Sequence, residues 1–171
     1  MMRNVVTVSV LEAYDDESLL RSYLDTFTDY YPDFDDWFVN KVQPNLGKSR
    51  WILIARMGNE VAGVCIIKAT PAENKICALR VFDGFRHHGV GTSLVQYAID
   101  QLGDPQPLVT VPEEFRSQYA TLFRKFGFRQ MAIYRDYYRS GKSEYAFNGF
   151  LNESDHSSEA RKSAAAPRII A

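Results

Sequence analysis

A short run rich in glycine, arginine and histidine is the part of the chain best suited to chemistry. It reads Arg86-His87-His88-Gly89-Val90-Gly91 and follows the apolar segment Ile76–Phe82. A four-residue apolar repeat then begins at Val90, as on one face of a helix. A helix start offers unpaired N–H groups and partial positive charge, glycine lets a ligand approach, and arginine suits phosphate. The run therefore predicts a cradle for phosphate or pyrophosphate.

Two common phosphate-binding motifs do not match this cradle. The P-loop motif needs Gly-Lys-Ser/Thr at a fixed spacing, and the dinucleotide fingerprint needs a glycine where Leu94 stands. The run matches Arg-x-x-Gly-x-Gly after the strand Leu79-Arg80-Val81, and the later stretch Leu122–Phe128 ends in Gly-Phe. Both stretches resemble signatures of the GNAT N-acetyltransferase superfamily, over roughly Arg50 to Phe147. An ordinary strand–turn–helix crossover, with glycines for packing, is the alternative.

The resemblance implies that acetyl-CoA is the co-substrate and that no metal takes part. The strand Leu79-Arg80-Val81 would hold the pantetheine arm through its main chain, and the Val81 N–H would stabilise the oxyanion. The pyrophosphate would lie against Arg86, His87, His88, Gly89, Val90, Gly91 and Thr92. The adjacent histidines have no further residue at metal-ligand spacing, so we interpret them as loop residues beside phosphate.

The general acid and base are less clear. Many members of the superfamily carry a tyrosine that acts as general acid where this chain has Phe123. We predict that Phe123 still lines the cofactor site. Tyr119 lies one helical turn earlier and is the nearest substitute, with core packing as its alternative role. The glutamate that many members carry before the central Leu-x-Val is absent, and Glu73 in the preceding turn is only a possible base.

The acceptor would lie between the first two helices and the loop before the last strand, at Thr28–Trp37 and Arg135–Ser143. Acidic residues alternate with aromatic ones in the first segment, which contains the candidates Tyr31, Asp33 and Trp37. Such a surface suits a cationic amine, for example a polyamine, an amino sugar or a lysine. A solvated, acidic helix start is the alternative interpretation.

Hydrophobic periodicity and turn residues predict a mixed α/β fold. The element order is β-α-α-β-β-β-α-β-α-β-β, which is also that of a GNAT-like, mostly antiparallel sheet with helices on both faces. Strands are expected at Val5–Leu11, Trp51–Met57, Val61–Ala69, Ile76–Phe82, Leu108–Val111, Phe128–Tyr134 and Ser143–Phe150. Helices are expected after the cap at Asp15–Ser18, over Asp33–Val42, from Gly89 to Leu102, and from Glu113 to Phe126.

Composition limits the remaining possibilities. The 171 residues include 46% hydrophobic ones, which is enough for one core, so we expect an acetyltransferase-like domain over 1–150 and a flexible Ser/Ala-rich tail over 151–171. The net charge of -1 shows no basic excess, so we expect no nucleic-acid partner. No signal peptide or membrane span is expected, and Cys65 and Cys77 are interpreted as thiols of a cytoplasmic protein.

The sequence thus predicts an acetyl-CoA-dependent N-acetyltransferase of primary amines, as a monomer or a homodimer. Two alternatives stay open at this point. The missing tyrosine and glutamate would suit a non-catalytic module that binds acyl-CoA. A toxin that acetylates aminoacyl-tRNA is the other, although RNA binding normally uses a basic surface.

Overall fold

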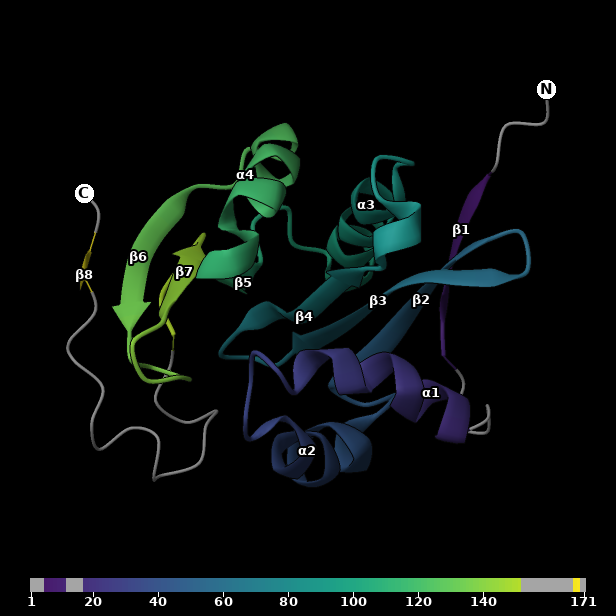
Figure 1. Cartoon of the computed structure of the whole chain (residues 1–171), viewed down its shortest axis with the longest axis horizontal. Coiled ribbons are helices and arrows are strands. Elements are labelled where there is room, and N and C mark those ends of the chain that lie inside the picture. Colours follow the sequence, from purple (N-terminus) through teal and green to yellow (C-terminus); the bar gives the residue numbers. More distant parts are fainter. Residues whose placement is uncertain (1–4, 12–16, 152–167, 170–171) are drawn as a thin grey trace.

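One mixed sheet of eight strands runs through the centre of the protein (Figure 1). The computed structural model describes residues 5–11, 17–151 and 168–169. The strand order in space is β1-β2-β3-β4-β5-β7-β6-β8, and every neighbouring pair is antiparallel except β4 and β5. The strands are β1 (Val6–Val10), β2 (Arg50–Met57), β3 (Glu60–Ala69), β4 (Asn74–Val81), β5 (Leu108–Pro112), β6 (Gln130–Arg135), β7 (Ser143–Phe147) and β8 (Arg168–Ile169).

Helices cover both faces of this sheet (Figure 1). One face carries α1 (Glu17–Leu24) and α2 (Phe34–Trp37), with the helical turns η1 (Asp25–Phe27), η2 (Phe38–Val42) and η3 (Gln43–Asn45). The other face carries α3 (Val90–Leu102) and α4 (Arg116–Lys125), preceded by the turns η4 (Asp83–Phe85) and η5 (Glu113–Phe115). Each face has its own core, because alternate strand residues point to opposite sides.

The predicted fold class and element order are confirmed. The largest local difference is in the second predicted helix, which winds as α2 and then widens into the π-type turn η2. The strand β8 is an addition to the prediction: Ile169 pairs with Ala132 at the edge of the sheet. The rest of the predicted tail, residues 152–167 and 170–171, lies outside the described residues.

Strands β4 and β5 begin as parallel neighbours and then part. Their pairing consists of Lys75 with Leu108 and Ile76 with Val109, at the first residues of each strand. Beyond this point β5 pairs on its other side with β7. The second half of β4 therefore has a partner on one edge, β3, and an open edge toward β5. We call this opening the β4–β5 wedge.

A bulge in β4 decides which side chains face each core. Ala78 lies opposite Ile66 in β3 and Ile76 lies opposite Ile67, so Cys77 is the extra residue. After the bulge Leu79 belongs to the core under α3 and α4. The alternation of a strand then turns Arg80 toward the α1–α2 face.

Helix α3 sits close to the sheet because β3 has a glycine beneath it. A Cβ atom built on Gly63 would lie 2.7 Å from the carbonyl oxygen of Arg80 and 3.0 Å from Cδ1 of Leu94. The first contact is with backbone and cannot be relieved by a side-chain rotation. The glycine thus holds both α3 and the C-terminal half of β4 in place.

We predict that Gly63→Ala lowers the free energy of unfolding by about 1–3 kcal/mol, because overpacking must move backbone. Gly84→Ala is the matched control, since nothing lies within 4 Å of its Cβ position, and it should stay within about 0.5 kcal/mol. Urea unfolding of the three proteins measures both values. Equal stabilities would contradict the close contact of β3 with β4.

Candidate functional site

The wedge leaves main-chain groups of β4 facing an open edge. The N–H of Phe82 donates to the carbonyl of Ala62 in β3, at 2.9 Å. Because successive residues of a strand point their N–H and C=O groups to opposite edges, those of Val81 face the wedge. Those of Leu79 face it too, and its carbonyl accepts a hydrogen bond from outside the sheet.

Tyr119 of α4 provides that hydrogen bond. Its hydroxyl donates to the Leu79 carbonyl at 3.1 Å, and the side chain is only 2% exposed. Burial raises the pKa of Tyr119 to about 12, against the opposing effects of the positive charge of Arg80 and a hydrogen bond with the Val81 backbone. The hydroxyl is thus a protonated donor at neutral pH, placed between the two main-chain groups that face the wedge.

The glycine-rich turn brings the start of α3 to the end of β4. Gly89 precedes the helix with a φ of +83°, and His87 also has a positive φ, +64°. The first hydrogen bond of the helix runs from Ser93 N–H to Gly89 C=O, at 3.0 Å. The N–H groups of the first turn have no partner four residues back, so this end can receive an anion.

Two arginines stand beside this turn around one carboxylate. Arg86 is paired with Asp83 at 2.7 Å, while the nearest nitrogen of Arg80 is 4.0 Å from the same carboxylate. The Nε atom of Arg86 is buried and has no hydrogen-bond partner among the described residues. A donor of this kind beside a helix N-terminus fits a phosphate oxygen.

The opposite mouth of the wedge, on the α1–α2 face, contains a buried glutamate. Glu144 of β7 is 4% exposed, and the Tyr31 hydroxyl donates to its Oε1 atom at 2.8 Å. Burial raises the pKa of Glu144 to about 7, although hydrogen bonds from Tyr31 and Thr110 and the positive charges of Lys75 and Arg139 oppose the shift. A carboxyl group that titrates near neutral pH can accept a proton from an amine.

Aromatic rings close this mouth of the wedge. Tyr31 meets Tyr138 edge to face, with ring centroids 5.0 Å apart. Burial raises the pKa of both phenols well above the ordinary value of 10.0. Neutral phenols around Glu144 keep the local dielectric low, which strengthens any charge interaction made there.

Comparisons with known proteins agree with this geometry. Residues 48–130 match the Acetyltransferase (GNAT) domain family. This segment, just under half of the chain, is thus similar to GNAT acetyltransferase domains. A curated N-alpha-acetyltransferase of Sulfolobus acidocaldarius is 34% identical over 73 residues, which are 41% of this chain and 44% of the relative. The chain thus matches less than half of the length of that relative.

Solved structures share the GNAT fold. An acetyltransferase of Bacillus subtilis in complex with CoA has a TM-score of 0.62 at 21% identity, covering 86% of this chain and 100% of that one. The ribosomal-protein-S18-alanine N-acetyltransferase of Escherichia coli has a TM-score of 0.62 at 20% identity, covering 88% and 98%. These matches show the fold, and the family match supports the acyltransferase class.

The structure brings the predicted cofactor residues together and separates the predicted acceptor residues. Main-chain groups of Leu79 and Val81 lie at the wedge, and Gly89 through Thr92 form the start of α3. His87 and His88 are exposed beside them, and Phe123 is fully buried against Tyr119. Of the three acceptor candidates, Tyr31 lies at the wedge, Asp33 is exposed before α2, and Trp37 packs on Phe34 and Arg50.

Glu144 was missed by the sequence analysis. The search for a base followed the GNAT pattern on β4, whereas Glu144 lies on β7 and reaches the wedge because β7 pairs with β5. One signal was present in the sequence. A single carboxylate stands in the strand segment Ser143–Phe147, before the run Tyr-Ala-Phe, and charged side chains are seldom found inside a buried strand.

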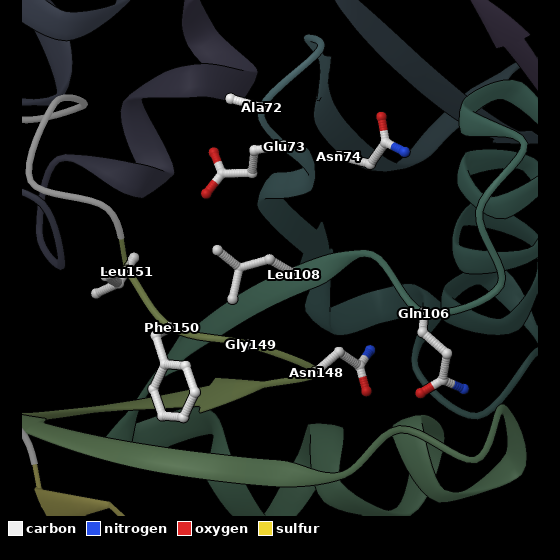
Figure 2. A pocket seen from close by; sticks show the side chains of 9 residues that line it. All are labelled: Ala72, Glu73, Asn74, Gln106, Leu108, Asn148, Gly149, Phe150 and Leu151. Atoms are coloured by element: carbon white, nitrogen blue, oxygen red, sulfur yellow. The ribbon is translucent and has the colours of Figure 1, made fainter.

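A cavity of about 430 Å³ lies elsewhere in the protein (Figure 2). Its walls are the turn before β4, the start of β5 and residues 148–151, with Glu73, Leu108 and Phe150 among them. Asn74, at the first residue of β4, also lines it. Val81 lies seven residues farther along an extended strand, roughly 20 Å away. This cavity is therefore separate from the wedge.

Among the described residues, no three histidine, cysteine, aspartate or glutamate side chains gather closely enough to hold a metal ion. The helices of the same residues are all too short or too polar to cross a membrane.

The raised pKa of Glu144 predicts how stability depends on pH. The folded protein binds a proton up to about pH 7, whereas the unfolded chain releases it near pH 4.5. The free energy of unfolding should therefore fall as pH rises from about 4.5 to 7, by an amount on the order of 3 kcal/mol.

Glu144→Gln keeps an acceptor for Tyr31 and removes the titration, so it should be more stable than the wild type at pH 8 but not at pH 5. Glu60→Gln, at the exposed first residue of β3, is the control for loss of a carboxylate. Urea unfolding at both pH values measures the difference. A wild-type stability that rises over this range, unaltered by Glu144→Gln, would contradict the burial of a titrating carboxyl group.

Proposed function

We propose that this protein is an N-acetyltransferase that moves an acetyl group from acetyl-CoA to a primary amine. The observation that carries the proposal is the open edge of β4 directly before the start of α3. Main-chain groups of Leu79 and Val81 suit the amides of pantetheine, and the helix start with Arg86 suits the pyrophosphate. The same strand–turn–helix unit thus matches both parts of one long ligand.

The two mouths of the wedge suggest how the reaction proceeds. The acceptor ammonium first loses a proton to Glu144, and its lone pair then forms a bond to the thioester carbon. The Val81 N–H stabilises the oxyanion. Its collapse breaks the C–S bond, the sulfur leaves with the electron pair, and the thiolate takes the Tyr119 proton. The Tyr119 phenolate then takes the second proton from the acylated nitrogen and is restored to the phenol. The products are the N-acetyl amine and CoA.

The names of the relatives favour an α-amino group as the first acceptor to test. One relative is an N-alpha-acetyltransferase, and one structural neighbour acetylates an alanine of ribosomal protein S18 according to its name. The acidic patch predicted for a cationic acceptor is weaker support, because Asp35 is paired with Arg21 at 2.8 Å. Cys65 and Cys77 are reduced thiols, which suits the reducing cytoplasm as the place of action.

Arg86→Ala tests the cradle. We predict that wild-type Tm rises with acetyl-CoA and with CoA, because a ligand of the native state stabilises it by mass action. The variant should bind both on the order of 10- to 100-fold more weakly, through loss of a charged phosphate contact. Its affinity for acetyl-pantetheine, which lacks the pyrophosphate, should not change.

Lys41→Ala removes an exposed charge far from the cradle, on η2, and serves as the control for net charge. Titration calorimetry with the two ligands gives the affinities. The proposed function is wrong if neither CoA form binds the wild type. The Arg86 assignment alone is wrong if both ligands weaken equally in the variant.

The pH–rate profile tests Glu144. We expect kcat to rise with pH through an apparent pKa near 7, because the proton acceptor must be ionised. Glu144→Gln should lower kcat on the order of 10²-fold and remove this limb, while the KM for acetyl-CoA stays within about twofold. Thiol release measures the rate. A variant with full activity and the same profile would exclude Glu144 as the base.

A further inference from the structure

Arg80 is a buried guanidinium group with unused donors. Its Nε and Nη1 atoms are buried and have no hydrogen-bond partner among the described residues, and its Nη2 atom is 4.0 Å from Asp83. The side chain is 16% exposed. Leaving a charged donor without a partner in such a place is costly, so a ligand that supplies acceptors would be bound strongly.

Two neighbouring aromatic rings pack against one side of this guanidinium. The Cζ atom lies 4.5 Å from the centroid of the Phe115 ring and 5.9 Å from that of Tyr30, and the two centroids are 4.7 Å apart. The N–H bonds of a guanidinium lie in its plane, so stacking leaves them available. The arrangement orients Arg80 and preserves the planar fork that matches a carboxylate or a phosphate.

The position of Arg80 connects it with the acceptor. Its neighbours Leu79 and Val81 turn their side chains into the core under α3 and α4, whereas Arg80 reaches Tyr30 on the α1–α2 face. The adjacent residue Tyr31 bonds to Glu144. Arg139 lies near both Tyr30 and Glu144, since its Cζ atom is 5.4 Å from the Tyr30 ring centroid and its charge acts on Glu144.

Arg139 itself is already occupied. It makes two hydrogen bonds to the carboxylate of Glu114, at 2.9 and 2.7 Å. Arg80 has no such arrangement with Asp83. Of the two arginines that flank Tyr30, Arg80 is therefore the one with donors to offer to a ligand.

We propose that Arg80 binds an oxyanion of the acceptor, so that the substrate is a primary amine carrying a carboxylate or a phosphate. The inference rests on the proposed acetyltransferase function. The ammonium end of the substrate lies toward Glu144 and Tyr31, and the oxyanion end lies toward Arg80 and Tyr30. Binding of the oxyanion involves no covalent change. A polyamine, which has no anionic group, would meet an unpaired positive charge at this place.

Matched pairs of amines test the proposal. β-Alanine is compared with β-alaninamide, and O-phosphoethanolamine with ethanolamine, each rate being divided by the fraction of unprotonated amine. The anionic member should be preferred on the order of 10- to 100-fold in kcat/KM, as for a hydrogen bond to a charged group. The pair with the larger ratio identifies carboxylate or phosphate as the natural group.

Arg80→Gln should remove this preference and leave the affinity for acetyl-CoA within about twofold. Arg116→Gln is the matched control, because Arg116 also stacks on an aromatic ring, that of Tyr145 at 4.9 Å, but bonds to Gln130. A Tm at least as high as that of the wild type would show that Arg80→Gln folds. We expect such a Tm because the substitution removes a charge that is largely shielded from water.

Three outcomes overturn the assignment. Equal rates on neutral and anionic amines, unaltered by Arg80→Gln, would leave an acetyltransferase without an oxyanion subsite. Weaker binding of acetyl-CoA by the variant would place Arg80 in the cofactor site. If no amine is turned over, the Tm shift with β-alanine and with O-phosphoethanolamine still decides: a shift of the wild type lost in Arg80→Gln supports the subsite, and no shift overturns it.

Discussion

The parting of β4 from β5 is the constraint on which the rest of the site depends. Two residue pairs hold the strands together, at Lys75–Leu108 and Ile76–Val109. A fully paired β5 would use the main-chain groups of Leu79 and Val81 for sheet hydrogen bonds and leave nothing for a ligand. Beyond Val109 the pairing of β5 continues with β7, on its other edge. The same pairing brings Glu144 to the wedge.

The two mouths of the wedge differ in the charges that they present to a ligand. The mouth toward α3 combines a helix N-terminus with Arg86 and suits a ligand of high negative charge. The mouth toward α1 and α2 contains one buried carboxyl group, Glu144, and one buried guanidinium, Arg80. Both charges are costly to keep away from water. Their cost is best understood if a substrate with both an ammonium and an oxyanion completes the arrangement.

Sequence reasoning predicted the fold and the cradle because both depend on local patterns. The four-residue repeat from Val90 and the glycines before it specify a helix and its start without reference to distant residues. The roles of Glu144 and Arg80 depend on strand order and on the bulge at Cys77. Neither property leaves a local pattern, and a bulge reverses the face of every residue after it. Arg80 was accordingly listed among the cofactor residues, although its main chain pairs with Val64 of β3 and we propose that its side chain faces the acceptor.

Tyr119 links the resting protein to the reacting one. In the absence of a ligand its hydroxyl satisfies the Leu79 carbonyl, which would otherwise be a buried acceptor without a partner. A pantetheine amide that takes over this carbonyl replaces one hydrogen bond by another, so the exchange adds little net affinity. Under the proposed function, affinity for the cofactor then comes mainly from the phosphate cradle, and the wedge orients the thioester. The same exchange would free the Tyr119 hydroxyl, once the cofactor is bound, to donate a proton to the sulfur.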